Sequence, residues 1–365
     1  MLNFAPTEEQ EEIRRLAHSV ATEQLRPQGR SAEARSDISA ELMQTLAQTG
    51  LTTPFPEAYG GSGAIEAVTY TLIAEELGFG DGGLAMNIIG SLMGPLTVAL
   101  AGDESQQERH IRPFCNEREG YLRRGSLAFA ERTGGYRLAE IATTVRREGD
   151  TCIVNGSKRD VIHGDQSNPR VVLARLEGTS GSDGLCALMV PAPLDGLHIS
   201  ADIQKLGLIA APSASFVFED AAVQATCMLG EPENRGVMRA ATLYNILRAA
   251  VACGMARAAL EYASDYAKQR IAFGRPIVSY QGIAFMISEM AMKLDAARLL
   301  VWRAATNWDA GDVDETLWCN AEAAQHQAMK IAQSATTDAI QIMGGAGFMQ
   351  DHPAEMWMRN AAAME

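Results

Sequence analysis

Two changes of hydrophobic period divide this chain of 365 residues into three parts. From Thr7 to about Cys115 the apolar residues recur with the spacing of helices, and from Val237 onwards they do so again. Between about Leu122 and Gly230 the period changes to alternation or short apolar runs, which indicate strands. We therefore expect an α+β protein of three domains, formed by residues 1–121, 122–233 and 234–365.

The first domain is expected to consist of helices. Thr7 followed by Glu8, Glu9 and Gln10 is a capping-box start, and further helices are predicted over residues 39–49, 64–77 and 84–101. The turn from Gly60 to Gly63 is glycine-rich, as phosphate-binding loops are. No strand precedes it and no Lys-Ser/Thr follows, so a plain helix connector is the better interpretation.

The central part contains five segments rich in β-branched and aromatic residues. They are Thr143–Arg147, Thr151–Gly156, Arg170–Leu176, Leu185–Val190 and Ala214–Phe218. No helical pattern of ten residues separates them, so we expect an antiparallel sheet or barrel and no Rossmann domain. In the last part, long helices over residues 237–270, 281–305 and 317–343, joined by short turns, predict a bundle.

Composition argues against several functions. The formal net charge of -14 argues against nonspecific nucleic-acid binding, which needs a basic face. The six cysteines contain no CxxC pair and the six histidines no HxxxH or HExxH spacing, so we predict no disulfide framework and no metal site. There is no signal-peptide pattern, and we expect no apolar run that approaches 18 residues. We expect a cytoplasmic protein without a membrane anchor.

One stretch near the end interrupts the last helical pattern. After Gln341 the chain runs through Gly344, Gly345 and Gly347 and resumes a helical pattern at Pro353. Three glycines and a glutamine are thus presented at a helix end, where a ligand could bind. Taken alone, a glycine cap followed by a proline-initiated helix is the simpler interpretation.

Three blocks in the C-terminal third resemble the acyl-CoA dehydrogenase family in order and spacing. They are Tyr266-Ala-Lys-Gln-Arg270-Ile-Ala-Phe273-Gly274, Gln281-Gly-Ile-Ala-Phe-Met, and the glycine stretch followed by Pro353 and Arg359-Asn360. The resemblance implies an N-terminal helical domain, a central antiparallel β-barrel and a C-terminal four-helix bundle. It also implies a flavoprotein, usually tetrameric, with FAD at a subunit interface.

In that family FAD is held by two half-sites, one of which reaches across to a neighbour's flavin. The resemblance assigns to this half-site Arg270 at the pyrophosphate, Phe273 at the adenosine portion, and Gln281, Gln341, Gly344 and Gly345 along the dinucleotide. Arginine offers a charge-assisted fork to phosphate, and glycine lets backbone N–H groups approach it. Tyr244 and Arg248 are assigned to substrate binding in the same way.

The half-site from the β-domain departs from the family pattern. The family's Thr-Glu-Pro-Gly-x-Gly-Ser-Asp is replaced by residues 130–137, so a hydroxyl is lost at Ala130 and a small residue becomes Tyr136. The family's Trp-Ile-Thr is replaced by residues 160–162, which places Asp160 where Trp stands and Ile162 where Thr stands. Each lost hydrogen bond costs only about 0.5–1.5 kcal/mol, but the losses accumulate. The alternative is ordinary divergence with FAD still bound in both half-sites.

The catalytic base is not found in the sequence. The family places a Glu about nine residues beyond the pair matched by Arg359-Asn360, and the sequence stops at Glu365 before that position. A minority of members place the Glu just before the arginine matched by Arg248, where this chain has Leu247. Glu365 is a nearby carboxylate at the wrong spacing, and a native chain that continues to a catalytic Glu is a further alternative.

The leading hypothesis is FAD-dependent α,β-desaturation of an acyl-CoA thioester by a homo- or hetero-oligomer, a dimer of dimers. As a sub-hypothesis, the chain is a subunit of a heteromeric enzyme that oxidises steroid-type side chains, and it lends its half-site to a partner subunit. The alternative is a catalytically inactive scaffold of the same fold. Electron-transfer flavoprotein is the redox partner that the resemblance implies. The sequence names neither the acyl chain nor the type of oligomer.

Overall fold

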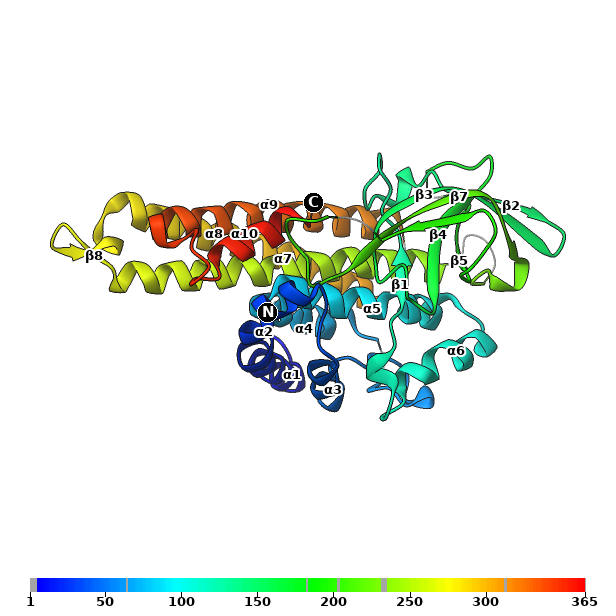
Figure 1. Cartoon of the computed structure of the whole chain (residues 1–365), viewed down its shortest axis with the longest axis horizontal. Coiled ribbons are helices and arrows are strands. Elements are labelled where there is room, and N and C mark those ends of the chain that lie inside the picture. The colour runs from blue at the N-terminus through cyan, green and yellow to red at the C-terminus, as the bar shows by residue number, and fades with distance from the viewer. Residues whose placement is uncertain are drawn as a thin grey trace.

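The computed structural model describes residues 5–63, 65–181, 183–201, 204–230, 235–311 and 314–364. The N-terminal part is helical (Figure 1), with α1 Glu8–Val20, a π-helical turn Ala21–Leu25, α2 Arg26–Arg35, α3 Ala40–Gln48, α4 Ala67–Gly80, α5 Gly82–Ala101 and α6 Glu104–Ile111. The predicted capping box is confirmed at α1. Thr7 Oγ1 accepts from Gln10 N at 3.2 Å, and Gln10 Oε1 accepts from Thr7 N at 3.0 Å. Ala64, where a helix was expected to begin, lies outside the described residues, and α4 begins at Ala67.

Helix α5 corrects one expectation about apolar runs. It has 20 residues and no charged side chain, so its length and composition would suffice to cross a membrane. Most of it is buried inside the fold, where it packs against α4, α6, α7 and β1. We conclude that α5 is the core helix of the N-terminal part.

The central sheet differs from the expected barrel. Its strands are β1 Ser126–Ala128, β2 Thr144–Glu148, β3 Thr151–Ile162, β4 Arg170–Leu176, β5 Leu185–Met189, β6 Leu197–Ser200 and β7 Ser213–Gln224, in the order β1-β4-β2-β3-β7-β6 with β5 on β4. The predicted barrel is wrong, because the sheet is not closed: its edge strands β1 and β6 have only three and four residues and do not pair with each other. The sheet is also mixed, since β4 runs parallel to β1 and β2.

The described residues of the C-terminal part form three long α-helices and one short α-helix. They are α7 Arg235–Gln269, α8 Gln281–Asp309, α9 Glu315–Met343 and α10 Ala354–Ala362, with a small hairpin, β8 Ile271–Ala272 and β9 Arg275–Pro276, between α7 and α8. One face of α8 carries the buried side chains of Met290, Leu294, Ala297 and Val301. Helix α4 also packs on α7 and α8, so the N-terminal part contributes a helix to this layer.

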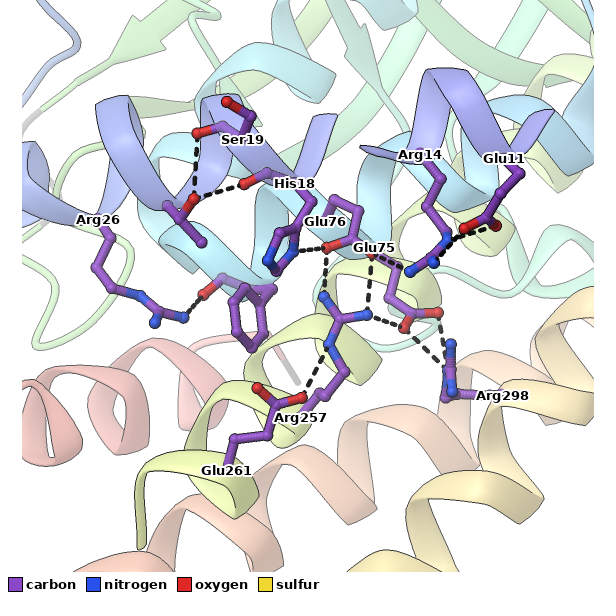
Figure 2. A network of polar contacts seen from close by, with 12 residues as sticks. Glu11, Arg14, His18, Ser19, Arg26, Glu75, Glu76, Arg257, Glu261 and Arg298 are labelled. Carbon is purple, nitrogen blue, oxygen red and sulfur yellow. Dashed lines mark hydrogen bonds and ion pairs between the residues drawn. The ribbon is translucent and has the colours of Figure 1, made fainter. Parts of the chain in front are cut away.

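A buried ion-pair network joins α4 to the bundle (Figure 2). Glu75 and Glu76 are adjacent on α4 and both buried, and Arg257 of α7 binds both carboxylates. Arg298 of α8 binds Glu75 at 2.9 Å, and Arg14 of α1 binds Glu76 at 3.3 Å. Burial by itself would raise the pKa of Glu76, but the hydrogen bonds and charge of Arg257 lower it below its usual value. The network thus fixes the N-terminal helices on α7.

Candidate active site

The middle of α7 brings together the two residues assigned to substrate binding. Tyr244 and Arg248 are one turn apart and are both 3% exposed. The ring of Tyr136, from the loop after β1, lies over Arg248 with its centroid 3.4 Å from Cζ, and it meets Tyr244 edge-on at 5.9 Å between centroids. The sequence did not predict that Tyr136 would contact these residues.

Several polar atoms of this site have no partner within the described part of the chain. Arg248 Nη2 donates to Met364 O at 2.6 Å, whereas Arg248 Nε and Nη1 find no acceptor. Asn245 Nδ2 donates to Tyr136 O at 3.1 Å, whereas its Oδ1 finds no donor. Burial raises the pKa of the Tyr244 phenol well above its usual range, so this residue stays neutral. Asn245 was missed by the sequence analysis, although a polar residue one turn before Arg248 in an Ala-rich helix was a usable signal.

The turn that carries Tyr136 is fixed by the buried carboxylate of Glu131. Its side chain accepts from Lys158 Nζ at 2.6 Å, from Thr143 N at 3.0 Å and from Ala142 N at 2.7 Å. Its backbone pairs with Gly135 in both directions. Burial would raise the pKa of Glu131, but the charge of Lys158 lowers it. A carboxylate so fully bonded is structural and does not serve as the base.

The residues around the β-domain half-site offer few groups to a flavin. Ala130 and Ile162 are buried hydrocarbons where the family pattern has hydroxyls. Asp160 lies at an irregularity of the β3–β7 pairing, with φ of 52°, and pairs with Arg159 at 3.0 Å. The donor set therefore does not fit the group that the family holds here.

The other half-site residues gather at the end of the bundle that is remote from the sheet (Figure 1). Arg270 and Phe273 lie on the β8–β9 hairpin, Gln281 begins α8, and Gly344 and Gly345 follow α9. Phe273 is 96% exposed, and Arg270 has no carboxylate partner among the described residues. A Cβ added at Gly344 or Gly345 would meet nothing within 4 Å, so the backbone of this turn is open to a ligand. Gln341 is exposed on the last turn of α9. Guanidinium, aromatic, amide and open backbone groups fit a dinucleotide.

The two groups of site residues cannot serve one ligand within one chain. Helix α7 carries Arg248 near its middle and leads directly into Arg270. At a rise of about 1.5 Å per residue these positions are roughly 33 Å apart. Arg248 and Arg270 therefore lie too far apart to contact the same part of one ligand within one chain.

Among the residues that the structure describes, none is assigned as the base. Glu365 lies outside the described residues. Arg359 pairs with Glu33 at 2.5 Å and with Glu355 at 2.7 Å, and Asn360 Oδ1 accepts from Leu208 N at 2.7 Å, so the Arg359-Asn360 pair is structural. Leu247 is buried against apolar residues of α4 and α5.

Comparison with known proteins decides the family. Sequence profiles of the N-terminal, middle and C-terminal domains of acyl-CoA dehydrogenases match residues 7–118, 126–221 and 234–365. The chain belongs to the acyl-CoA dehydrogenase family. It is 32% identical over 362 residues to the 3-(aryl)acrylate reductase of Clostridium sporogenes. The match covers 97% of this chain and 93% of the relative.

Two solved structures resemble this family member along its whole length. Butyryl-CoA dehydrogenase from Megasphaera elsdenii superposes with a TM-score of 0.84 at 29% identity, over 100% of this chain and 95% of the other. A chain from a structure of the electron-transferring flavoprotein of Acidaminococcus fermentans superposes with a TM-score of 0.85 at 30% identity, over 100% and 94%.

Proposed function

We propose that this chain is a subunit of an FAD-dependent acyl-CoA dehydrogenase that introduces an α,β double bond into an acyl-CoA thioester, with domains formed by residues 1–121, 122–233 and 234–365. Family membership and the likeness to a butyryl-CoA dehydrogenase support the reaction. The thioester carbonyl acidifies the α-proton, and FAD, when bound, accepts the hydride from the β-carbon. The protein contributes alignment and electrostatics.

The observation that carries the proposal is the position of the bundle-end residues. Arg270 binds the pyrophosphate and Phe273 packs on the adenosine portion of a flavin seated on a neighbouring subunit. Gln281, Gln341, Gly344 and Gly345 line the dinucleotide, while Tyr244 and Arg248 belong to the substrate side. Their exposure and their separation of roughly 33 Å from Arg248 support a shared site.

An exposed apolar stripe supports an oligomer. Phe285, Met292 and Leu299 recur at intervals of seven on α8 and are 62%, 66% and 53% exposed. Large apolar side chains repeated on one helix face indicate a protein contact. We place another family subunit on this face, in a homo- or heterotetramer built as a dimer of dimers, with electron-transfer flavoprotein as the redox partner and a cytoplasmic location.

Flavin content tests the proposal. The protein is purified alone and together with each acyl-CoA dehydrogenase chain encoded beside it, and flavin per chain is measured by visible absorbance. Flavin that appears with a partner and is bleached by an acyl-CoA supports the shared site. Stoichiometric flavin in the protein alone, bleached by an acyl-CoA, contradicts the need for a different partner chain and leaves the homotetramer, whose neighbouring copy completes the site.

A second candidate is a scaffold that has kept the fold without the reaction. Ala130, Ile162 and the ring of Tyr136 favour it, because they remove flavin and substrate contacts. Absence of flavin and of activity with every co-expressed partner would support this function.

A further inference from the structure

The space beside Arg248 is filled by a side chain of the same chain. The ring of Tyr136 covers the face of the guanidinium at 3.4 Å from Cζ, and Phe129 meets that ring edge-on at 5.5 Å between centroids. Tyr244 contacts it from α7, and Asn245 holds the backbone carbonyl of Tyr136. The ring is thus packed on the face that a ligand of Arg248 would use.

Two side chains under this ring keep buried polar atoms without hydrogen-bond partners among the described residues. Asn245 is 1% exposed and Arg248 3%, and each keeps unpartnered polar atoms in the described part of the chain: Oδ1 of Asn245, and Nε and Nη1 of Arg248. A buried cation with free donors is costly unless an acceptor completes it. A thioester or amide carbonyl would supply the acceptor, and an amide N–H of the pantetheine arm would supply a donor to Asn245.

The apolar side chains beside this turn of α7 also leave little room for a ligand. Leu247 lines a cavity of about 20 Å³ between α4, α5 and α7, whose other walls include Leu77, Ile88 and Leu92. This volume holds about one water molecule and no acyl chain. An acyl group would enter only if side chains moved.

We propose that Tyr136 decides whether this chain takes an acyl-CoA in its own site. With the ring on Arg248 the site is closed to substrate, and a small side chain at this position opens it to short acyl thioesters. This inference rests on the proposed function, because it takes Tyr244 and Arg248 as substrate-binding residues.

The test compares Tyr136→Ser with Tyr136→Phe in the full-length protein. Binding of butyryl-CoA is measured by equilibrium dialysis. We expect Tyr136→Ser to bind at least about tenfold more tightly than the wild type, the equivalent of about 1.4 kcal/mol. Tyr136→Phe should bind like the wild type, since its ring still covers the guanidinium. The inference is overturned if Tyr136→Ser binds no more tightly than Tyr136→Phe.

Further variants separate this inference from its alternatives. If Tyr136→Ser does not fold, Tyr136→Leu keeps apolar packing and should bind with intermediate affinity; equal binding by Tyr136→Leu and Tyr136→Phe would again overturn the inference. Adding Arg248→Met to an open variant should abolish the gain, and a gain that survives would contradict the role of Arg248. If the proposed flavin site is wrong, the flavin content of Arg270→Gln stays unchanged. That measurement does not depend on Tyr136.

Discussion

Lys158 Nζ lies 2.6 Å from Glu131 Oε1, and both side chains are buried beneath the turn that carries Tyr136. Replacing Lys158 by Met would leave the Glu131 carboxylate without its cation in a site that excludes water. We expect a loss of about 3–5 kcal/mol in the free energy of unfolding. Urea denaturation checks this value, and adding Glu131→Gln should recover part of the loss. An unchanged midpoint in Lys158→Met would contradict the structural role of the pair.

The network of Figure 2 predicts a similar loss at Arg257. Arg257→Met leaves Glu75 and Glu76 with Arg298, Arg14 and His18 alone. We expect about 3 kcal/mol of destabilisation in chemical denaturation. Lys268→Met, which removes the exposed pair with Asp265 on the same helix, is the control and should change little. Equal effects of the two substitutions would show that burial of the network adds nothing.

Asp81 predicts an unusual pH dependence. Its carboxylate caps α5 by accepting from Leu84 N, and burial raises its pKa to about 6. The folded state therefore binds the proton more tightly than the unfolded state, so the stability from Asp81 is present at low pH and is lost as the pH rises through about 6. Asp81→Asn keeps the cap and removes this loss. Its stability relative to the wild type should increase from about pH 4 to about pH 7.

The matched control is Asp103, which caps α6 at the surface. Hydrogen bonds from Gln106 N and Ser105 lower its pKa, so its stabilisation is present above the unfolded pKa and is lost as the pH falls. Asp103→Asn should therefore lose stability relative to the wild type as the pH rises to about 4, and thermal melts should show no gain between about pH 4 and about pH 7. Parallel pH profiles for the two variants would contradict the assignment.

Short-range sequence patterns predicted much of the fold. Short-range patterns include the capping box at Thr7, the helical pattern over residues 281–305 and the β-branched runs of β2, β3, β4, β5 and β7. The structure confirms the elements that these patterns predict. Closure of the sheet depends on long-range pairing, and strands as short as β1 and β6 leave little local pattern. The strand pattern left a sheet or a barrel open, the resemblance implied a barrel, and the barrel is wrong because the sheet is not closed.

The site was harder to predict than the fold. The family resemblance marked Arg248 and Arg270, but nothing in the local sequence shows what surrounds either side chain in the folded protein. The stacking of Tyr136 on Arg248 joins segments 112 residues apart in the chain, and the contact of Met364 O with Arg248 joins segments 116 residues apart. Such contacts exist only after the sheet, α7 and the C-terminus have packed.

The most direct test of the shared flavin site compares two arginines of one hairpin. Arg270→Gln and Arg275→Gln are each co-purified with the partner chain that gives the wild type its flavin, and flavin dissociation is followed by absorbance. Arg275 stacks on Tyr280 and lies on the same exposed hairpin, so it controls for local charge. We predict at least about tenfold weaker flavin binding for Arg270→Gln, as expected for loss of a charged hydrogen bond, and wild-type binding for Arg275→Gln. Flavin held equally tightly by both variants would contradict the account.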